Sequence, residues 1–158
     1  MIILTMTILA AAATALAVVS TRRQRALLTD PIYGCLTRQG IERQWRGNQH
    51  VLFFDIDGMH AANTALGYDI VNRRIRSALR VCRAGEAAAG RWFSGDEIVV
   101  LAPSDRIAAQ IRQRLIAALL NEDMTATFAI AAPHGSLAET VALAASVVQQ
   151  KKQQRGVA

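Results

Sequence analysis

Two pairs of acidic residues stand beside apolar segments of the sequence, where their carboxylates could share a divalent metal ion. Asp55 and Asp57 close the apolar run 51–54, and Asp96 and Glu97 lie in a turn between two strand-like segments. Mg²⁺ takes only one or two carboxylates from a protein and fills its other positions with phosphate oxygens and water. The pattern therefore indicates metal-assisted phosphoryl transfer.

Each pair also has a purely structural interpretation. Asp-x-Asp after a strand is often only a cap for the next helix, and the segment 94–97 suits a hairpin turn with solvated acids. Ser94 and Gly95 are nevertheless small enough for a bulky anion to approach the backbone. The combination of the two acidic pairs favours chemistry over a simple turn.

Three segments of the chain follow one another in an order that is typical of a known family. They read DPIYGCLTR from Asp30, DIDGMHAANTALGYD from Asp55 and RWFSGDEI from Arg91, with Asn72 between the last two. This order resembles that of the GGDEF family of diguanylate cyclases, whose motifs read roughly DPLTGLxNR, DxDxFKxxNDxxGH, GD and GG(D/E)EF. The resemblance covers about residues 30–156, and the chain is identified as a divergent member with an SGDEI signature.

The resemblance implies a fold, an activity and a cofactor. The fold is α+β and palm-like, a mixed β-sheet flanked by helices. The activity is that of a nucleotidyl cyclase, which condenses two purine nucleoside triphosphates, GTP and by extension ATP, into a cyclic dinucleotide such as cyclic di-GMP and releases pyrophosphate. The implied cofactor is Mg²⁺ or Mn²⁺. Because each protomer brings one substrate, turnover needs a homodimer.

The resemblance implies roles for individual residues of this chain, wherever they match the motifs of the family. Asp55, the carbonyl of Ile56 and Asp96 fall on the metal ligands, and Asp96 and Glu97 fall on the catalytic carboxylates. Asp57 and Glu97 could instead be solvated or pair with arginines. The positions implied for substrate binding are Asn63, Asn72, Ser94, Gly95, Lys151, Lys152 and Arg155.

The chain departs from the family at both ends of the implied substrate. Asn72 stands where the family has an aspartate that accepts two hydrogen bonds from guanine, whereas an amide offers one acceptor beside its donor group. Strict guanine selectivity is therefore not implied, and Asn72 could also be an exposed helix residue without a base contact. Near the C-terminus Gln153 occupies the position of the family's lysine, although Lys151, Lys152 and Arg155 are close by.

These departures leave other functions open. One is a catalytically degenerate domain that binds a nucleotide or dimerises in signalling without turnover, an alternative supported by Asn72, Ser94 and Ile98. The presence of both metal carboxylates argues against it. Another is a relative of palm-type polymerases that makes a different oligonucleotide product.

The N-terminal segment 1–21 carries no charged side chain, and a run of arginines follows at once in 22–25. An apolar helix of about 20 residues spans the hydrocarbon core of a bilayer, and basic residues at one end bias that end toward the cytoplasm. The sequence thus predicts a single-pass anchor in the inner (cytoplasmic) membrane with the catalytic domain in the cytoplasm. The predicted parts are a transmembrane helix (1–21), a basic juxtamembrane linker (22–29) and a GGDEF-like domain (30–158). A cleaved signal peptide and a soluble helix that pairs with a copy of itself are the alternatives.

A net charge of +6 raises the question of nucleic-acid binding. The basic residues are spread over several helices, and aromatic residues make up only 5% of the chain, too few to interleave as stacking platforms. No nucleic-acid partner is expected, and solvated helix faces that attract nucleoside triphosphates or anionic lipids fit the charge instead. The two cysteines match no metal-binding spacing, so no zinc site is expected.

Hydrophobic periodicity predicts the elements that must position these residues. Apolar side chains recur at three- and four-residue steps in 71–82, 107–118 and 137–148, and each run marks an amphipathic helix. Shorter helices are expected at 37–45, with Thr37 as the cap, and at 59–66. Strands are expected at 51–56, 88–94, 97–102 and 125–131.

Overall fold

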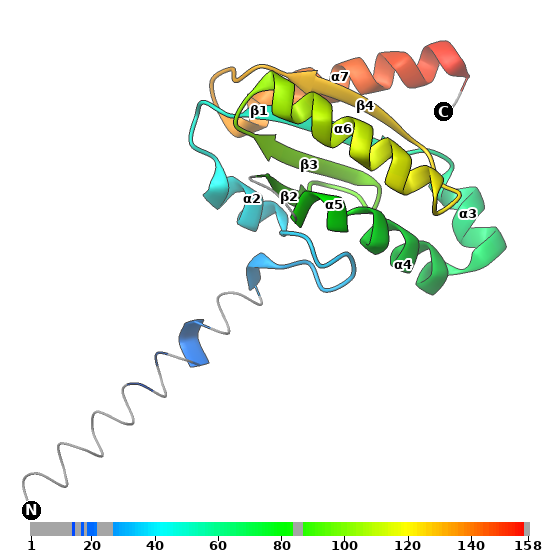
Figure 1. The fold of residues 1–158 in the computed structure, drawn as a ribbon, viewed down its shortest axis with the longest axis horizontal. Helices are drawn as coiled ribbons and strands as arrows, with labels where there is room; N and C mark the ends of the chain where they lie inside the picture. The colour runs from blue at the N-terminus through cyan, green and yellow to red at the C-terminus, as the bar shows by residue number, and fades with distance from the viewer. Residues whose placement is uncertain (1–13, 15–16, 18, 22–26, 84–86, 157–158) are drawn as a thin grey trace, which may run out of the picture.

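A four-stranded β-sheet carries helices on both faces (Figure 1). The computed structural model describes residues 14, 17, 19–21, 27–83 and 87–156. In chain order the elements are α2 (Arg38–Gln44), β1 (His50–Ile56), α3 (Met59–Leu66), α4 (Tyr68–Ala78), α5 (Arg80–Arg83), β2 (Ala88–Arg91), β3 (Glu97–Ala102), α6 (Asp105–Leu120), β4 (Ala126–Ala131) and α7 (Leu137–Arg155). The expected α+β class is confirmed.

The strands lie in the order β2-β3-β1-β4, and each of the three neighbouring pairs is antiparallel. The expectation of a mixed sheet is therefore wrong. β1 and β2 run in the same direction, but the hairpin after β2 returns β3 between them, so these two strands are not neighbours. One isolated parallel bridge, between Leu36 and Gly90, lies outside the pairing of the named strands.

The register of the sheet decides which polar side chains meet. Asp55 of β1 lies opposite Glu97 of β3 on one side and opposite Thr127 of β4 on the other. Because successive side chains of a strand point to opposite faces, these three residues share one face of the sheet with Phe53. A shift of one residue would turn all of them to the other face.

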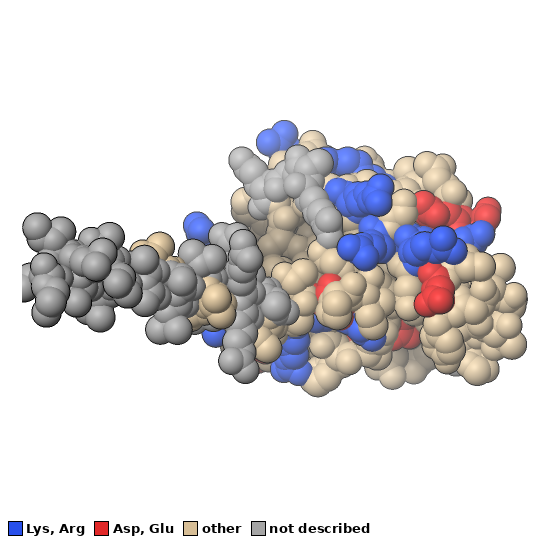
Figure 2. Space-filling view, turned by 90° about the horizontal axis from the view of Figure 1, so that it is seen from below, with Lys and Arg blue, Asp and Glu red and all other residues tan. Residues whose placement is uncertain are grey.

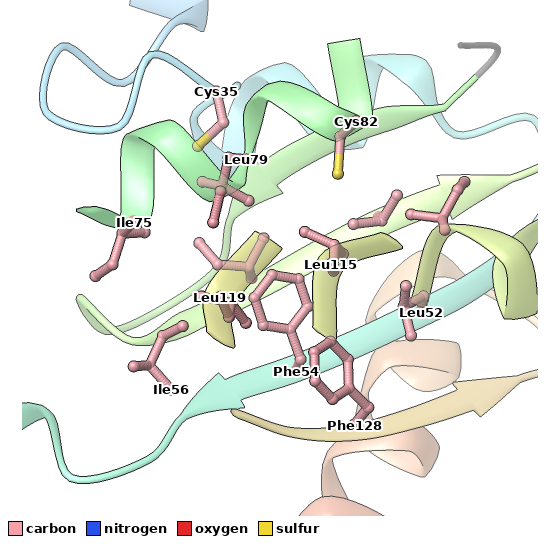
Figure 3. Close-up of a cluster of buried hydrophobic side chains, with 14 of the residues drawn as sticks. Cys35, Leu52, Phe54, Ile56, Ile75, Leu79, Cys82, Leu115, Leu119 and Phe128 are labelled. Atoms are coloured by element: carbon pink, nitrogen blue, oxygen red, sulfur yellow. The ribbon is translucent and has the colours of Figure 1, made fainter. Parts of the chain in front are cut away.

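The face of the sheet toward α4, α5 and α6 is closed by an apolar core (Figure 3). The rings of Phe54 from β1 and Phe128 from β4 stack with their centroids 5.0 Å apart. Leu115 and Leu119 of α6 lie beside them, and Ile75 of α4 belongs to the same cluster. Burying this apolar surface fixes the helices on the sheet.

Two free thiols, Cys35 and Cys82, lie buried in the same core. Burial is the largest cause that raises the pKa of Cys35 to about 11 and the pKa of Cys82 to about 12. Both side chains flank a small cavity of about 220 Å³ that is lined mostly by alanine and leucine. At neutral pH the two cysteines therefore stay protonated and act as small apolar core residues.

The opposite face of the sheet is covered by α7 and α2. Val141, Ala144 and Val148 of α7 pack into a second buried cluster with Val51 and Phe53 of β1. The N-terminus of α7 is fixed by Ser136 and Glu139, which form a reciprocal capping box. The last turns of α7 consequently pass over the acidic end of β1.

Most of the expected helices and strands are confirmed, but one helix and one strand differ in length from the expectation. The periodic run 71–82 is divided between α4 and α5, because α4 ends at its cap, Leu79. β2 ends at Arg91 and does not continue to residue 94, because the chain turns there toward β3. Thr37 does cap α2, and its hydroxyl oxygen accepts a 3.2 Å hydrogen bond from the Gly40 N–H.

The predicted transmembrane helix at 1–21 falls almost wholly outside the described residues, and so does most of the predicted linker at 22–29. Within the described ranges, no helix combines the length and the apolar character that a membrane span requires.

Candidate active site

β1 delivers Asp55 to one end of the sheet, on the face covered by α7. Lys152 in the last turns of α7 reaches the same point, where its Nζ lies 2.6 Å from Asp55 Oδ1 and 3.4 Å from Asp57 Oδ1. Thr127 of β4, a buried residue, donates a 2.9 Å hydrogen bond from its hydroxyl to the same oxygen of Asp57. Three separate elements therefore hold these two carboxylates in place.

The electrostatic balance at Asp55 is unfavourable for its negative charge. Burial is the largest cause that raises the pKa of the Asp55 carboxyl above its usual value, and the neighbouring Asp96 and Asp57 raise it further. Lys152 lowers this pKa through its hydrogen bond and its charge, without cancelling the rise. Three carboxylates next to one ammonium form a site that an additional cation would stabilise.

The turn at 92–96 brings the second acidic residue to β1. The Ile56 N–H donates to the carbonyl of Asp96 at 3.1 Å, and the Trp92 N–H donates to the carbonyl of Glu97 at 2.9 Å. Ser94 donates a short hydrogen bond from its hydroxyl to Asp96 Oδ1. The carboxylate of Asp96 is therefore oriented by its own turn, while its backbone is held by β1.

A buried tyrosine holds the centre of this turn. The hydroxyl of Tyr33 donates a 2.5 Å hydrogen bond to the carbonyl of Gly95, and burial is the main cause that raises the pKa of Tyr33 to about 12. A Cβ atom at Gly95 would lie 3.2 Å from the guanidinium of Arg91, which is tighter than an ordinary contact. A larger residue would have to displace that side chain.

Asp30 and Arg91 connect the turn to the start of the domain. One carboxylate oxygen of Asp30 accepts hydrogen bonds from the N–H groups of Ile32, at 3.0 Å, and Tyr33, at 2.8 Å. The other carboxylate oxygen pairs with the Arg91 guanidinium at 3.2 Å, and Arg91 Nε donates to the carbonyl of Ser94 at 3.2 Å. These supporting residues were not predicted as site residues, although Asp30 and Tyr33 belong to the segment that carried the resemblance.

Phe93 lies in the turn, and its side chain is 74% exposed. The guanidinium of Arg38 on α2 lies 4.3 Å from the Phe93 ring centroid and 4.4 Å from that of Trp92. Arg38 therefore stacks on these two rings, while Arg91 contacts the Ser94 carbonyl and Asp30. Phe93 consequently presents an aromatic surface to solvent next to Asp96.

A cleft of about 430 Å³ opens between α7 and the sheet beside Asp55. Glu97 and Lys152 line it together with Gln149 and Gln153, and its floor is formed by Phe53 and Val148. Within the described part of the chain, Glu97 Oε2 is buried and has no hydrogen-bond partner. An unpaired carboxylate oxygen at the edge of a cleft is available to a ligand or to a proton.

The donor set at this end of the sheet bears on which metal ion could bind there. Among the described residues, no group of three or more His, Cys, Asp and Glu side chains is arranged to hold a metal. A magnesium site needs no such group, because one or two carboxylates suffice when phosphate oxygens and water complete the shell. The carboxylates of Asp55 and Asp96 with the carbonyl of Ile56 fit this type of site, and the Lys152 ammonium lies against Asp55.

The two asparagines implied for base binding lie on the consecutive helices α3 and α4. Asn63 of α3 has its Oδ1 buried without a hydrogen-bond partner in the described structure. Asn72 lines an open cleft of about 580 Å³ on α4, together with Ile32, Asp69, Arg73 and Arg76. The described clefts therefore do not bring Asn72 next to Asp55.

The three basic residues near the C-terminus have different neighbours. Lys151 donates a 2.8 Å hydrogen bond to the carbonyl of Phe128 on β4, and Lys152 pairs with Asp55 at 2.6 Å. Arg155 lines another cleft, which is also lined by Asp57 and by residues of α6 and β4. Only Lys152 of these three contacts the acidic residues at the end of β1 among the ion pairs of the described chain.

The wider surface carries its positive charge in several groups. Figure 2 shows the side of the molecule on which α4 and α5 lie, with basic side chains gathered there and acidic ones beside them. Arg73 and Arg76 of α4 are exposed and border the Asn72 cleft. An anionic ligand in that cleft would consequently meet a positive edge.

Solved structures of GGDEF domains are similar to this chain. A microbial GGDEF domain determined for its interaction with bis-(3,5)-cyclic di-GMP has a TM-score of 0.70 and 22% identity, covering 83% of this chain and 94% of that chain. The coiled coil and GGDEF domain of DgcB from Caulobacter crescentus, in complex with c-di-GMP, has a TM-score of 0.73 and 15% identity, covering 93% and 91%. The diguanylate cyclase SiaD from Pseudomonas aeruginosa, in complex with its activator SiaC, has a TM-score of 0.63 and 18% identity, covering 90% and 68%.

No protein-family model matches the sequence, and no curated protein matches it. At the identities of the solved structures, the similarity concerns the fold. The resemblance expected from the three sequence segments is confirmed at that level.

Proposed function

From its GGDEF-domain fold and from the carboxylates that meet at one end of its sheet, we propose that this chain is a nucleotidyl cyclase. It condenses two purine nucleoside triphosphates, GTP and by extension ATP, into a cyclic dinucleotide second messenger such as cyclic di-GMP. The observation that carries the proposal is the 3.1 Å hydrogen bond from the Ile56 N–H to the Asp96 carbonyl, which joins the two acidic segments.

The proposed reaction consists of two equivalent phosphoryl transfers. In each transfer the 3′-oxygen of one nucleotide forms a bond to the α-phosphorus of the other, the bond from that phosphorus to the bridging oxygen breaks, and pyrophosphate leaves. Glu97, whose side chain lines the cleft, accepts the proton of the 3′-hydroxyl. Each protomer presents one triphosphate, so the active species is a homodimer.

The carboxylates of Asp55 and Asp96 and the carbonyl of Ile56 would hold Mg²⁺ or Mn²⁺. When bound, the metal supplies charge neutralisation at the phosphates and lowers the pKa of the attacking hydroxyl. Thr127 keeps Asp57 oriented beside this site. Ser94 holds the Asp96 side chain, and the small residue Gly95 lets a phosphate approach the backbone of the turn.

Substrate recognition is assigned to the remaining polar residues. Lys152, which lies in the cleft, would bind the triphosphate, with Lys151 and Arg155 as neighbouring cations on α7. Asn63, with its unpaired Oδ1, and Asn72 would contact the base.

A direct test measures the product. The purified full chain is incubated with GTP, with ATP and with both, in Mg²⁺ or Mn²⁺, and the products are identified by mass. A cyclic dinucleotide together with pyrophosphate is the expected result. Intact triphosphates under every condition would contradict the proposed activity.

Membrane anchoring is part of the same proposal. The uncharged segment 1–21 with the arginines that follow would place the chain in the inner membrane, with the catalytic domain in the cytoplasm. Cell fractionation should recover the full chain in the membrane pellet, and a chain lacking residues 1–20 in the soluble fraction. Recovery of the full chain in the cytosol would favour a soluble dimerising helix.

A catalytically degenerate nucleotide-binding or dimerising domain is the second candidate. The observation that favours it is the ion pair between Lys152 and Asp55, which partly neutralises a proposed metal ligand. Binding of a triphosphate without any conversion to product would identify this alternative.

A further inference from the structure

The ammonium of Lys152 lies against two carboxylates, and one of them, Asp55, is a proposed metal ligand. Its Nζ lies 2.6 Å from Asp55 Oδ1 and 3.4 Å from Asp57 Oδ1. The Lys152 and Asp55 side chains are 19% and 22% exposed, so water screens this pair only in part. A single positive charge is thus placed among carboxylates that could otherwise bind a doubly charged ion.

The reach of Lys152 is set by the packing of α7. Val148, one turn earlier, is buried in the cluster between α7 and β1. Lys151, the preceding residue, is tied to the carbonyl of Phe128 on β4 at 2.8 Å. These two contacts fix the rotation of the helix, which directs the Lys152 side chain into the cleft beside Asp55.

We propose that Lys152 is an internal competitor for the metal and that a triphosphate relieves this competition. The inference rests on the proposed function, since it takes Asp55 as a metal ligand. A divalent ion bound to Asp55 would lie close to the ammonium that contacts the same carboxylate at 2.6 Å, and the two positive charges repel each other. The charge of Lys152 therefore weakens metal binding to the free protein, and movement of Lys152 away from Asp55 strengthens it.

A nucleoside triphosphate changes this balance because it carries several negative charges. Its phosphate oxygens offer the ammonium new partners within the same cleft, while they also supply ligands to the metal. Each of the two ligands then removes an obstacle to the other. Metal and triphosphate are consequently coupled, and by linkage the coupling acts equally in both directions.

The inference is tested by Mn²⁺ binding and needs no catalytic turnover. Free Mn²⁺ is measured by electron paramagnetic resonance during titration of the full chain, with and without guanosine α,β-methylene triphosphate. The wild type is compared with Lys152→Met, which retains the apolar stem and removes the charge, and with Lys152→Gln as a second variant. Arg106→Met, which removes one positive charge from an exposed position on α6, is the control.

Without nucleotide, Lys152→Met and Lys152→Gln should bind Mn²⁺ roughly ten times more tightly than the wild type, the scale of one lost hydrogen-bonded ion pair. The analogue should tighten Mn²⁺ binding to the wild type and to Arg106→Met far more than to either Lys152 variant. Thermal unfolding followed by circular dichroism verifies that each variant is folded.

The outcomes separate this inference from the proposed function. If Mn²⁺ and the analogue bind to the wild type, Asp55→Asn removes the Mn²⁺ binding, and both Lys152 variants match the wild type without nucleotide, then the competition is refuted while the proposed site stands. If the wild type and the Lys152 variants bind no Mn²⁺ under either condition, both the inference and the proposed metal site are wrong.

Discussion

The two ends of the proposed substrate site are built in different ways. The acidic end is made by strand register, since Asp55 lies opposite Glu97 and Thr127 in the sheet and Asp96 is tied to β1. The Asn72 cleft is made by an exposed side of α4 and the nearby Ile32. Residues fixed by a sheet tolerate little change, whereas residues on one side of a helix can be exchanged without disturbing their neighbours. The difference from the family motif at residue 72 therefore lies at a position where a substitution disturbs the fold little.

Removal of a carboxylate at the acidic end is the substitution with the largest expected effect. Asp96→Asn should lower the rate of cyclic-dinucleotide synthesis by orders of magnitude, because it removes one of two carboxylates that would hold the metal. The fold should be retained, since Asp96 lies at a turn and is partly exposed. Product formation is measured by mass, with Asp123→Asn, a change at a side chain that is 84% exposed, as the control. Undiminished synthesis by Asp96→Asn would remove the mechanism.

At the other end the expected effect is smaller and concerns selectivity. ATP should compete measurably with GTP in the wild type, because the Asn72 amide can rotate to suit either purine. Asn72→Asp should restore guanine preference by roughly 1–3 kcal/mol, the scale of one buried unsatisfied polar group. Competition binding of the two triphosphates measures the change, and Asn48→Asp in an exposed loop serves as the control. If the wild type already excludes ATP and the substitution has no effect, residue 72 does not read the base.

Support of the turn can be tested without any ligand. Tyr33→Phe removes the hydroxyl that donates to the Gly95 carbonyl, so the free energy of unfolding should fall by about 1 kcal/mol. Tyr68→Phe, at a side chain that is 70% exposed, should change it little. Urea denaturation of both variants provides the comparison. Equal stability of the two variants would show that the hydrogen bond to the turn adds nothing to the fold.

The smallest expected effect is a pH dependence at the acidic end. The pKa of Asp55 is raised in the folded chain, chiefly by burial, so the folded state holds its proton more tightly than the unfolded state. The stability contributed by this residue is then fully present below the unfolded pKa of about 4 and is lost as pH rises through the higher folded value. Urea unfolding at a series of pH values, with chelator present, should show this loss in the wild type and not in Asp55→Asn. A wild type and variant that follow the same pH profile would contradict the assignment.

Much of the fold could be predicted because its signals are local. The steps of three and four residues that end at Val148 identified the buried side of α7, and the apolar run before Asp55 identified β1. The antiparallel order of the sheet could not be read in this way, because periodicity within β2 does not indicate that β3 returns between it and β1. Pairing between strands is decided by packing across the whole domain.

In the candidate site, too, some residues could be predicted from local patterns and others could not. Asp55 and Asp96 were identified from short segments, and their approach through the Ile56 N–H agrees with that expectation. The contact of Lys152 could not be singled out, because Gln153 occupied the matching position and only the rotation of α7 on the sheet decides which cation reaches Asp55. The link between Arg91 and Asp30 joins residues 61 positions apart, and no local pattern marks such a pair.

The burial of both cysteines makes the chain well suited to site-directed labelling. With thiol pKa values of about 11 for Cys35 and about 12 for Cys82, fewer than roughly one native thiol in a thousand is ionised near pH 7.5. A maleimide or nitroxide reagent will therefore react with a cysteine introduced on the surface in preference to the two native ones, which can be left in place. Replacing the exposed Phe93 by cysteine would put a spin label beside Asp96, and distances between labels would report directly whether two copies bring these turns face to face.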